Sequence, residues 1–318
     1  MNKKSNKIGA VIPCYMGGDI TIKLVQEVLK YVDIVVLVDD LCPLRTGTKL
    51  SKIYKNSNLH IIFNKRNLGV GGATKKGFCR LLDEGCDIIL KIDADNQMNP
   101  ADIPKICAPI LNKECDATKG NRFTNIENIL NMPKIRLFGN LVLSYITKLS
   151  TGYWEIFDPT NGFIAFRGSV LEKLDFKKIN DRFFFETDLL FRCGLKNISI
   201  NNVELDISYS NKYSSLNPLR ELPVFLVRNI KMFFKRVIYQ YFILDFNPGS
   251  IEIFMAILLG LFSLFFGSFL LYLSNARNVL TSAGTVSIFI ISTIVSIQFL
   301  IGFVYYDCST RILIRKKY

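Results

Sequence analysis

The sequence predicts an α/β fold, a mostly parallel β-sheet with helices on both faces, followed by two transmembrane helices. Over the first 220 residues, short runs rich in β-branched residues alternate with segments of helical periodicity, which is typical of strand-helix-strand units. Beyond residue 250, two stretches of 21 residues, 253–273 and 286–306, carry no charge. Each forms about 31 Å of helix, enough to cross a bilayer. Two buried helices of a soluble core are the disfavoured alternative, since such helices seldom run this far without a charged face.

Four strands are expected in the first hundred residues. They are residues 8–12, 34–38, 60–63 and 88–92. Between them, apolar residues recur at helical spacing from Ile22 to Val32 and from Ala73 to Leu82. In such a sheet the carboxyl ends of the parallel strands meet at one edge, and ligands bind there.

Composition narrows the class of protein. Forty Lys and Arg against 27 Asp and Glu give a net charge of +13, which favours a polyanionic neighbour: nucleic acid, an anionic membrane or a phosphorylated substrate. Nucleic acid is disfavoured because the cations cluster beside the apolar spans and no aromatic-basic module is present. One histidine, and eight cysteines without a CxxC pair, argue against histidine triads, zinc sites and a disulfide framework.

The cations also predict an orientation for the two spans. Basic residues precede the first span and follow the second, whereas the loop between them carries Arg277 alone, so both termini are expected in the cytoplasm. Residues 221–250 resemble an amphipathic helix lying on anionic headgroups, with a solvated domain helix as the alternative. The expected division is a catalytic domain over 1–220, this interfacial helix over 221–250, and a membrane hairpin with a basic tail over 251–318.

Polar residues gather where the expected strands end. Asp93 and Asp95 follow the apolar run 88–92 directly, and residues two apart in an extended segment point the same way. Both carboxylates can therefore face one Mg²⁺ or Mn²⁺, with an amide oxygen from Gln97 and the rest of the shell from substrate phosphates and water. A lone Asp-x-Asp is more often a solvated turn, but here it closes a buried strand.

The glycine-rich segment 67–73 follows the third expected strand and opens a helix. Its amides are candidates for phosphate contact. The GxGxxG spacing fails, however, since Thr74 stands where the third glycine belongs, and no GxxxxGK[ST] pattern is present. A tight strand-to-helix turn and direct phosphate contact remain equal alternatives.

Seven ordered motifs resemble those of family 2 glycosyltransferases of the GT-A fold. They are VIPCY (11–15), VDD (38–40), NKRNLGVGGATKKGF (64–78), KIDADNQMNP (91–100), KGNRF (119–123), DPTNGFIAFR (158–167) and FETDLLFR (185–192). Within this family, the chain resembles the polyprenyl-phosphate glycosyltransferases, the subgroup of dolichyl-phosphate mannose synthase. The resemblance implies a Rossmann-like GT-A sheet and an inverting transfer from a UDP- or GDP-sugar.

The resemblance also implies roles for individual residues. Catalytic roles fall on Asp95, Arg122, which would face phosphate, and Asp188, an acidic residue near the acceptor, with Glu186 as a residue that shares this role. Asp93, Asp95 and Gln97 are the implied metal ligands. The implied donor-binding residues are Pro13, Tyr15, Asp39, Asp40, Asp93, Ala94 and Lys212, the last in a segment that closes over phosphates beside Tyr213.

Three positions depart from the family pattern. Gly17 replaces the usual acidic residue two after Tyr15, residues 39–43 read Asp-Asp-Leu-Cys-Pro instead of DDGSxD, and 213–216 lack the closing lysine. The first two leave base and sugar identity open. The missing QxxRW motif argues against a processive polysaccharide synthase.

Three hypotheses about the reaction remain. In the first, a polyprenyl phosphate oxygen attacks the sugar; it is already anionic, so no strong base is needed. In the second, the acceptor is a hydroxyl of a lipid-linked saccharide, and Asp188 or Glu186 removes its proton. In the third, the chain is a nucleotide-sugar-binding membrane partner without turnover. Membrane lipids are partners in each, and homo-oligomerisation stays open.

Overall fold

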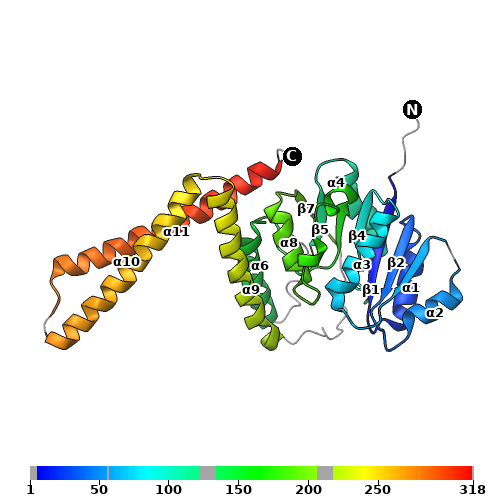
Figure 1. The fold of residues 1–318 in the computed structure, drawn as a ribbon, viewed down its shortest axis with the longest axis horizontal. Coiled ribbons are helices and arrows are strands. Elements are labelled where there is room, and N and C mark those ends of the chain that lie inside the picture. Colours follow the sequence, from blue (N-terminus) through cyan, green and yellow to red (C-terminus); the bar gives the residue numbers. More distant parts are fainter. Residues whose placement is uncertain (1–5, 56, 122–133, 206–217, 279, 317–318) are drawn as a thin grey trace. The chain divides into compact units, whose positions relative to one another are not determined.

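The computed structural model describes residues 6–55, 57–121, 134–205, 218–278 and 280–316 (Figure 1). The chain folds into two compact units, one ending at Phe233 and the other beginning at Phe234. Each of the eight cysteines is a free thiol.

The first unit is built on a seven-stranded mixed sheet. Its strands are β1 (Ile8–Cys14), β2 (Ile34–Asp39), β3 (Leu59–Phe63), β4 (Ile88–Lys91), β5 (Ala117–Asn121), β6 (Ile164–Arg167) and β7 (Ile200–Glu204). The order across the sheet is β3-β2-β1-β4-β6-β5-β7. Strand β6 pairs antiparallel with both of its neighbours, while the other pairs are parallel. The predicted mostly parallel α/β fold is confirmed, and all four expected strands are present.

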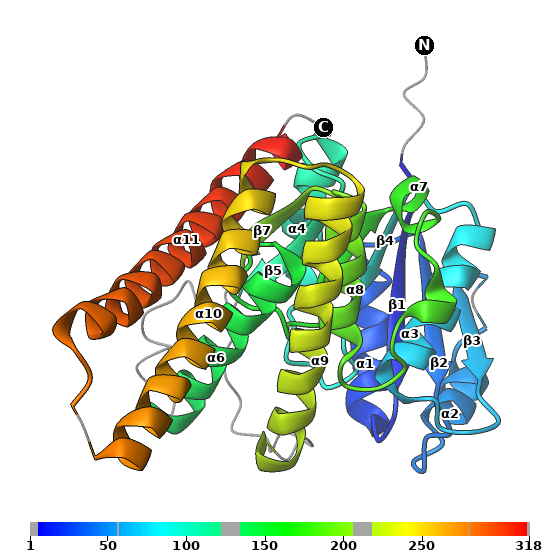
Figure 2. The ribbon, with the colours of Figure 1, turned by 60° about the vertical axis from the view of Figure 1, so that its left-hand side comes forward.

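Helices cover both faces of this sheet (Figure 2). They are α1 (Gly18–Val28), α2 (Thr46–Ile53), α3 (Gly69–Asp83), α4 (Ile103–Leu111), α6 (Lys134–Thr151), α7 (Gly168–Leu171) and α8 (Phe185–Leu195), with short 3₁₀ turns at Pro100–Asp102 and Phe176–Lys178. Alternate strand residues enter two apolar clusters: Ala10, Ile12 and Leu90 join α1 and α4, whereas Val11, Val36 and Ile89 join α3 and α8. This period of two is what a strand buried on both faces requires.

The position of the candidate site follows from the point in the sheet at which the strand order reverses, which is at β1. Strand β1 lies between β2 and β4, so the chain crosses to opposite sides of β1 as the sheet is built. The crevice outside the carboxyl ends of β1 and β4 is the usual ligand position in such a sheet. Tyr15, Asp40 and Asp93 all follow strand ends at this edge.

Helix α6 contains the apolar run 135–149, for which the sequence allows either a second interfacial helix or a domain helix packed on the sheet. It contacts α8 and buries Ser144, Thr147 and Ser150, and Ser150 Oγ donates to Asn229 Oδ1 of α9 (Pro218–Ile238) at 2.5 Å. The domain helix is therefore the better description. Its Tyr145, which stacks edge-on with Trp154 at 6.3 Å between ring centroids, is exposed.

The second unit is a helical hairpin. Helix α9 runs into the π-helix η3 (Tyr239–Ile243), followed by α10 (Pro248–Arg277) and α11 (Ala283–Lys316). Asn247 and Ser250 form a capping box at the start of α10, which satisfies amides that a helix N-terminus leaves open. Ser263 and Thr293 hydroxyls lie 2.6 Å apart between α10 and α11, and Ser296 Oγ donates to Ala256 O at 2.8 Å.

Both hairpin helices are long and apolar enough to cross a membrane. The spans Pro248–Arg277 and Ala283–Thr310 have peak mean hydropathies of 2.4 and 2.3. In the most apolar 18-residue stretch of each span, only 22% and 6% is buried. A core helix of a soluble protein is mostly buried. These spans contain the two uncharged stretches expected from the sequence.

Candidate active site

The Asp-Ala-Asp loop leaves β4 and is held by its own turn and by α1. Asp95 Oδ1 accepts from Gln97 N at 3.1 Å, and Thr21 Oγ1 donates to Ala94 O at 2.9 Å. Asn96 has φ of +59°, a left-handed conformation that asparagine tolerates better than most residues. These contacts leave the Asp95 side chain exposed, while the neighbouring Asp93 is half-buried.

Gly17, one of the departures from the family pattern, has a local explanation. A Cβ at this position would overlap Thr21 Oγ1 and lie 2.8 Å from Cys14 Sγ. The same Thr21 hydroxyl reaches the Ala94 carbonyl. The absence of a side chain at Gly17 therefore lets α1 approach and hold the Asp-Ala-Asp loop.

Lys91, the last residue of β4, is completely buried beneath this loop. Its Nζ lies 2.5 Å from Asp93 Oδ1 and 3.1 Å from Glu186 Oε1, in the first turn of α8. Burial acts to lower the pKa of Lys91, but the charges of Asp93 and Glu186 outweigh it and raise that pKa above its ordinary value. Lys91 is therefore a permanent cation between two carboxylates.

A turn from the strand on the other side of β4 closes over this ion pair. Gly162 precedes β6, and a Cβ there would overlap both Asp93 Oδ2 and Lys91 Nζ. Asn161 fixes the turn: its Nδ2 donates to Gly120 O at 2.8 Å, and its Oδ1 accepts from Phe163 N at 2.9 Å. The Thr-Asn-Gly sequence thus provides the space in which Lys91 and Asp93 meet.

Asp39 and Asp40, predicted donor-binding residues, both lie buried at the end of β2. Asp39 accepts from Cys42 N at 2.7 Å and Gly47 N at 2.8 Å, which closes the loop into α2. Asp40 accepts from Asn64 Nδ2 at 2.7 Å and from the backbone N of Leu68 and Gly69 at 2.8 Å. Each carboxylate shapes the loops of this edge.

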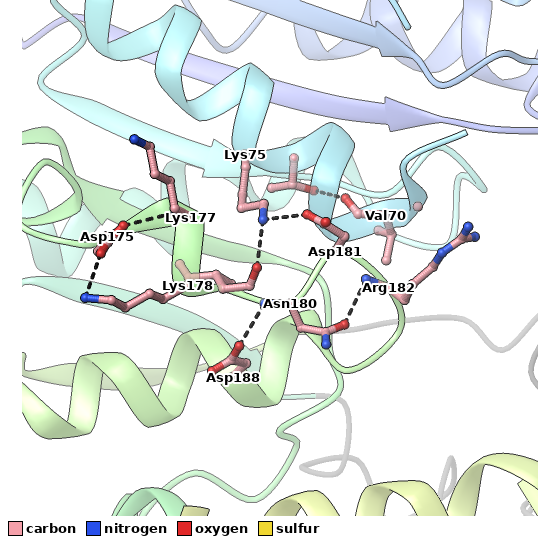
Figure 3. A network of polar contacts seen from close by, with 12 residues as sticks. Val70, Lys75, Asp175, Lys177, Lys178, Asn180, Asp181, Arg182 and Asp188 are labelled. Atoms are coloured by element: carbon pink, nitrogen blue, oxygen red, sulfur yellow. Dashed lines mark hydrogen bonds and ion pairs between the residues drawn. The ribbon is translucent and has the colours of Figure 1, made fainter. Parts of the chain in front are cut away.

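The glycine-rich turn that follows β3 is packed against the 180–185 segment (Figure 3). Gly72 N donates to Asp181 O at 3.0 Å, and a Cβ on Gly69, whose φ is +86°, would lie 2.7 Å from that same oxygen. A Cβ on Gly71 would overlap Asn180 O. With Asp40 bound to two further amides, this geometry supports the tight-turn alternative over direct phosphate contact.

Asp188 lies in a different set of contacts from Glu186, although the two are only two positions apart in α8. Asn180 N donates to Asp188 Oδ2 at 2.7 Å (Figure 3). Arg192 Nε lies 3.0 Å from Asp188 Oδ1. Asp188 is buried and anchors the loop that covers the glycine-rich turn. The structure thus brings Glu186, rather than Asp188, into contact with the Asp-Ala-Asp cluster through Lys91.

The remaining predicted site residues fall into two groups. Pro13 is buried within β1, and the Tyr15 side chain just beyond it is exposed, as a residue that meets a ligand at this edge must be. Arg122 and Lys212 lie outside the described residues. Their roles stay predictions.

The residues present are chemically suited to a cation that also binds substrate phosphates. Across the parts of the chain that the structure describes, no three His, Cys, Asp or Glu side chains form a ready-made metal cage. Mg²⁺ and similar ions need no such cage, since one or two carboxylates plus substrate phosphates suffice. Desolvation, together with the charge of Asp93, raises the pKa of the Asp95 carboxyl above its ordinary value. The exposed Asp95 with the Gln97 amide two residues on matches this ligand chemistry.

Sequence reasoning missed Lys91 and Gly162. A signal for Lys91 was present, because a lysine inside the apolar run Ile88–Ile92 must be buried with a counter-charge. Its partner Glu186 lies 95 residues away, and nothing in the spacing identifies that pairing.

A mostly parallel sheet whose fourth strand runs into an Asp-Ala-Asp loop is the arrangement of GT-A glycosyltransferases. The chain belongs to glycosyl transferase family 2: the family model "Glycosyl transferase family 2" matches residues 10–175, more than half of the sequence.

The names of two curated relatives state a lipid phosphate as the acceptor. A UDP-N-acetylglucosamine–dolichyl-phosphate N-acetylglucosaminyltransferase of Methanococcus voltae is 34% identical over 149 residues, which cover 47% of this chain and 59% of the relative. An undecaprenyl-phosphate mannosyltransferase of Micrococcus luteus is 26% identical, over 50% of this chain and 65% of that protein. The matched regions thus leave more than a third of each relative uncovered.

Solved structures confirm the fold. Glucosyl-3-phosphoglycerate synthase from Mycobacterium tuberculosis, in complex with Mn²⁺, uridine diphosphate and glucosyl-3-phosphoglycerate, is 17% identical, with a TM-score of 0.52 over 74% of this chain and 81% of that one. At this identity the likeness concerns the fold alone.

Proposed function

We propose that the chain transfers a hexose, with inversion, from a UDP- or GDP-sugar to polyprenyl phosphate at the cytoplasmic face of a membrane, with the help of Mg²⁺ or Mn²⁺. The observation that carries this proposal is an exposed Asp95 at the carboxyl end of β4 in a family 2 chain that also has two membrane-length helices. The names of the two lipid-phosphate relatives support the acceptor class.

On the donor side, Asp95 and Gln97, with Asp93 beside them, are the residues proposed to hold the cation. A divalent ion bound there would stabilise the negative charge that develops on the nucleotide as the sugar departs. The complex of a fold neighbour with Mn²⁺ and uridine diphosphate supports this choice of cofactor and donor. Tyr15, exposed beyond β1, is the residue proposed to contact the nucleoside.

On the acceptor side, a phosphate fits the charges better than a hydroxyl. A hydroxyl must lose its proton to a base, and each of the two candidate carboxylates is already engaged in an ion pair. Glu186 lies 3.1 Å from the buried Lys91, and Asp188 lies 3.0 Å from Arg192. A lipid phosphate is already anionic and needs no such base.

Helix α9 supplies the argument for membrane docking. Its surface within the first unit exposes Val224, Val227 and Ile230 next to the cations Arg228 and Lys231. Apolar side chains mixed with cations bind the surface of anionic lipid bilayers. With the cation bias around the spans, this favours a catalytic unit on the cytoplasmic side.

The test is transfer by the full-length chain in vesicles that contain polyprenyl phosphate. A panel of UDP- and GDP-sugars is supplied with Mg²⁺ or Mn²⁺, with and without EDTA, and lipid products are identified by mass spectrometry. A metal-dependent, acid-labile polyprenyl-phosphate sugar supports the proposal. Sugar on a lipid-linked saccharide instead, or no product from any donor, overturns it.

The Asp188→Asn variant separates the two acceptor classes. If the acceptor is a phosphate, the transfer rate of this variant should fall only modestly. The fall should match the loss of thermal stability that follows from weakening the Asn180 and Arg192 contacts. Near-total loss of transfer at unchanged stability would instead identify Asp188 as the base of a hydroxyl acceptor.

A further inference from the structure

A completely buried lysine in a β-strand requires an explanation. Lys91 has no exposed surface and sits in β4 between the apolar strands β1 and β6, in register with Val11 and Ile164. Burying an ammonium is costly unless it is paired and hydrogen-bonded. An apolar residue at this position would pack against the same neighbours without that cost.

The pairing of Lys91 joins two different parts of the site. Asp93, 2.5 Å away, belongs to the Asp-Ala-Asp loop, and Glu186, 3.1 Å away, opens α8. Both carboxylates keep part of their surface open, with side-chain exposures of 30% and 13%. The cation is thus inaccessible, while the two carboxylates that it holds stay partly exposed.

The charges of this cluster match one divalent ion. Asp93, Asp95 and Glu186 contribute three negative charges and Lys91 one positive charge, which leaves two negative charges. Lys91 contacts Oδ1 of Asp93, so Oδ2 of the same carboxylate lies on the side of the Gly162 turn. A side chain at Gly162 would break this arrangement.

We propose that Lys91 is a positioning residue and an internal counter-charge of the transfer site: its ammonium holds the donor-side Asp93 and the acceptor-side Glu186 in one fixed arrangement. The inference rests on the proposed function for the meaning of the two sides. In this proposal the role of Glu186 on the acceptor side is its contact with Lys91. Glu186 is not proposed to transfer a proton.

The test combines direct Mn²⁺ binding with transfer, using the full-length chain in detergent micelles. Free Mn²⁺ is titrated by EPR, alone and with UDP or GDP, for the wild type, Lys91→Met, Glu186→Gln and the double variant. Because Lys91 repels the ion and Glu186 attracts it, Lys91→Met should bind Mn²⁺ about threefold or more tightly and Glu186→Gln correspondingly more weakly. The double variant, with its net charge restored, should bind as the wild type does.

Transfer should change in the opposite direction from metal affinity. The transfer rate of Lys91→Met should be at least about tenfold lower than that of the wild type, because removal of a group that orients metal ligands typically has an effect of this size. The double variant should be no slower than the slower single variant, because both substitutions break one shared contact. Arg236→Met is the matched control: it removes a buried cation from the second unit, and Mn²⁺ affinity per folded molecule should not change.

The outcomes discriminate between positioning and simple packing. If Lys91→Met lowers Mn²⁺ affinity together with stability, or if the two substitutions multiply in their effect on transfer, the inference is wrong. Should Lys91→Met fail to fold, the weaker Mn²⁺ binding of Glu186→Gln, a residue outside the proposed ligand set, still tests it. A wild type that binds Mn²⁺ with this charge dependence but transfers no sugar would overturn the proposed function and leave the Lys91 arrangement standing.

Discussion

Lys91 in the first unit and Arg236 in the second are both completely buried, yet their surroundings differ. Lys91 bridges two partly open carboxylates from separate elements. Arg236 instead faces Asp307 of α11, with Nη1 to Oδ1 at 2.7 Å and Nη2 to Oδ2 at 2.8 Å, and Tyr241 Oη donates to the same carboxylate at 2.6 Å. Asp307 is itself fully buried.

The difference indicates two uses of a buried charge. A bidentate Arg-carboxylate pair with a further donor satisfies the carboxylate within the protein and ties the end of α9 and η3 to α11. Its effect is on the stability of the hairpin. The Lys91 cluster carries an excess of negative charge at a ligand edge and so has capacity for a cation. Substitutions around the two residues should therefore separate chemistry from folding.

Among substitutions that test the chemistry of the site, the largest loss of transfer rate is expected at Asp95. Asp95→Asn should lower the transfer rate about 10²- to 10³-fold, because the exposed carboxylate is the main proposed ligand of the cation. Thermal stability should stay within about 0.5 kcal/mol of the wild type, since the side chain is exposed. Full-speed transfer by this variant would contradict the assignment.

On the folding side, Asp307→Asn leaves the Arg236 charge buried without a carboxylate. Breaking such a pair costs about 3–5 kcal/mol, measured as denaturant unfolding in micelles. The double variant Arg236→Met with Asp307→Leu should recover most of this loss, because no charge is left buried. A single variant as stable as the wild type would show that the pair contributes nothing to the hairpin.

Gly162→Ala tests how closely the Lys91 cluster is packed. The added Cβ overlaps Asp93 Oδ2 and Lys91 Nζ, so we expect a loss of about 1–3 kcal/mol in stability and slower transfer. Gly139→Ala is the matched control, since among the described residues a Cβ at that site in α6 meets no atom within 4 Å outside its own helix backbone. It should stabilise the chain by about 0.5–1 kcal/mol. Equal effects at both sites would contradict the packing argument.

The smallest effect concerns pH. Desolvation and the Asp93 charge raise the pKa of Asp95, so its carboxyl takes up a proton at a higher pH than an ordinary aspartate, whose pKa is about 3.9. Mn²⁺ binding should weaken as pH falls through this raised pKa, and Asp93→Asn should move that midpoint to lower pH. EPR titrations between about pH 4 and 7 measure both curves. A midpoint that Asp93→Asn leaves unchanged would remove Asp93 as a cause.

Much of the fold could be predicted because its signals are local. Strands β1 to β4 are β-branched runs bounded by polar residues, and the membrane-length helices are uncharged for 21 residues. Strand β6, Ile-Ala-Phe-Arg, is four residues long, too short for a period to be measured. Its antiparallel insertion between β4 and β5 depends on pairings that local patterns do not encode.

The site shows the same limit. Asp93 and Asp95 were recognisable because they follow an apolar run, although residues 94–95 form a turn and not the extended segment that the spacing argument assumed. Whether the glycine-rich turn binds phosphate depended on what lies opposite, and the structure places Asp181 there, more than a hundred residues later in the sequence. Contacts of this kind arise from tertiary packing, which overrides what a motif indicates by itself.

The two aspartates at the end of β2 have a practical consequence for exchanging donor preference between relatives. Asp39 is bound to the 42–47 loop, and Asp40 is bound to Asn64, Leu68 and Gly69. A chimera that imports a foreign 39–47 segment alone would replace Asp40 and its loop but keep the native 64–69 turn. The amides of that turn donate to Asp40 in this chain. Segments 39–47 and 64–69 should therefore be transplanted together, as one cassette.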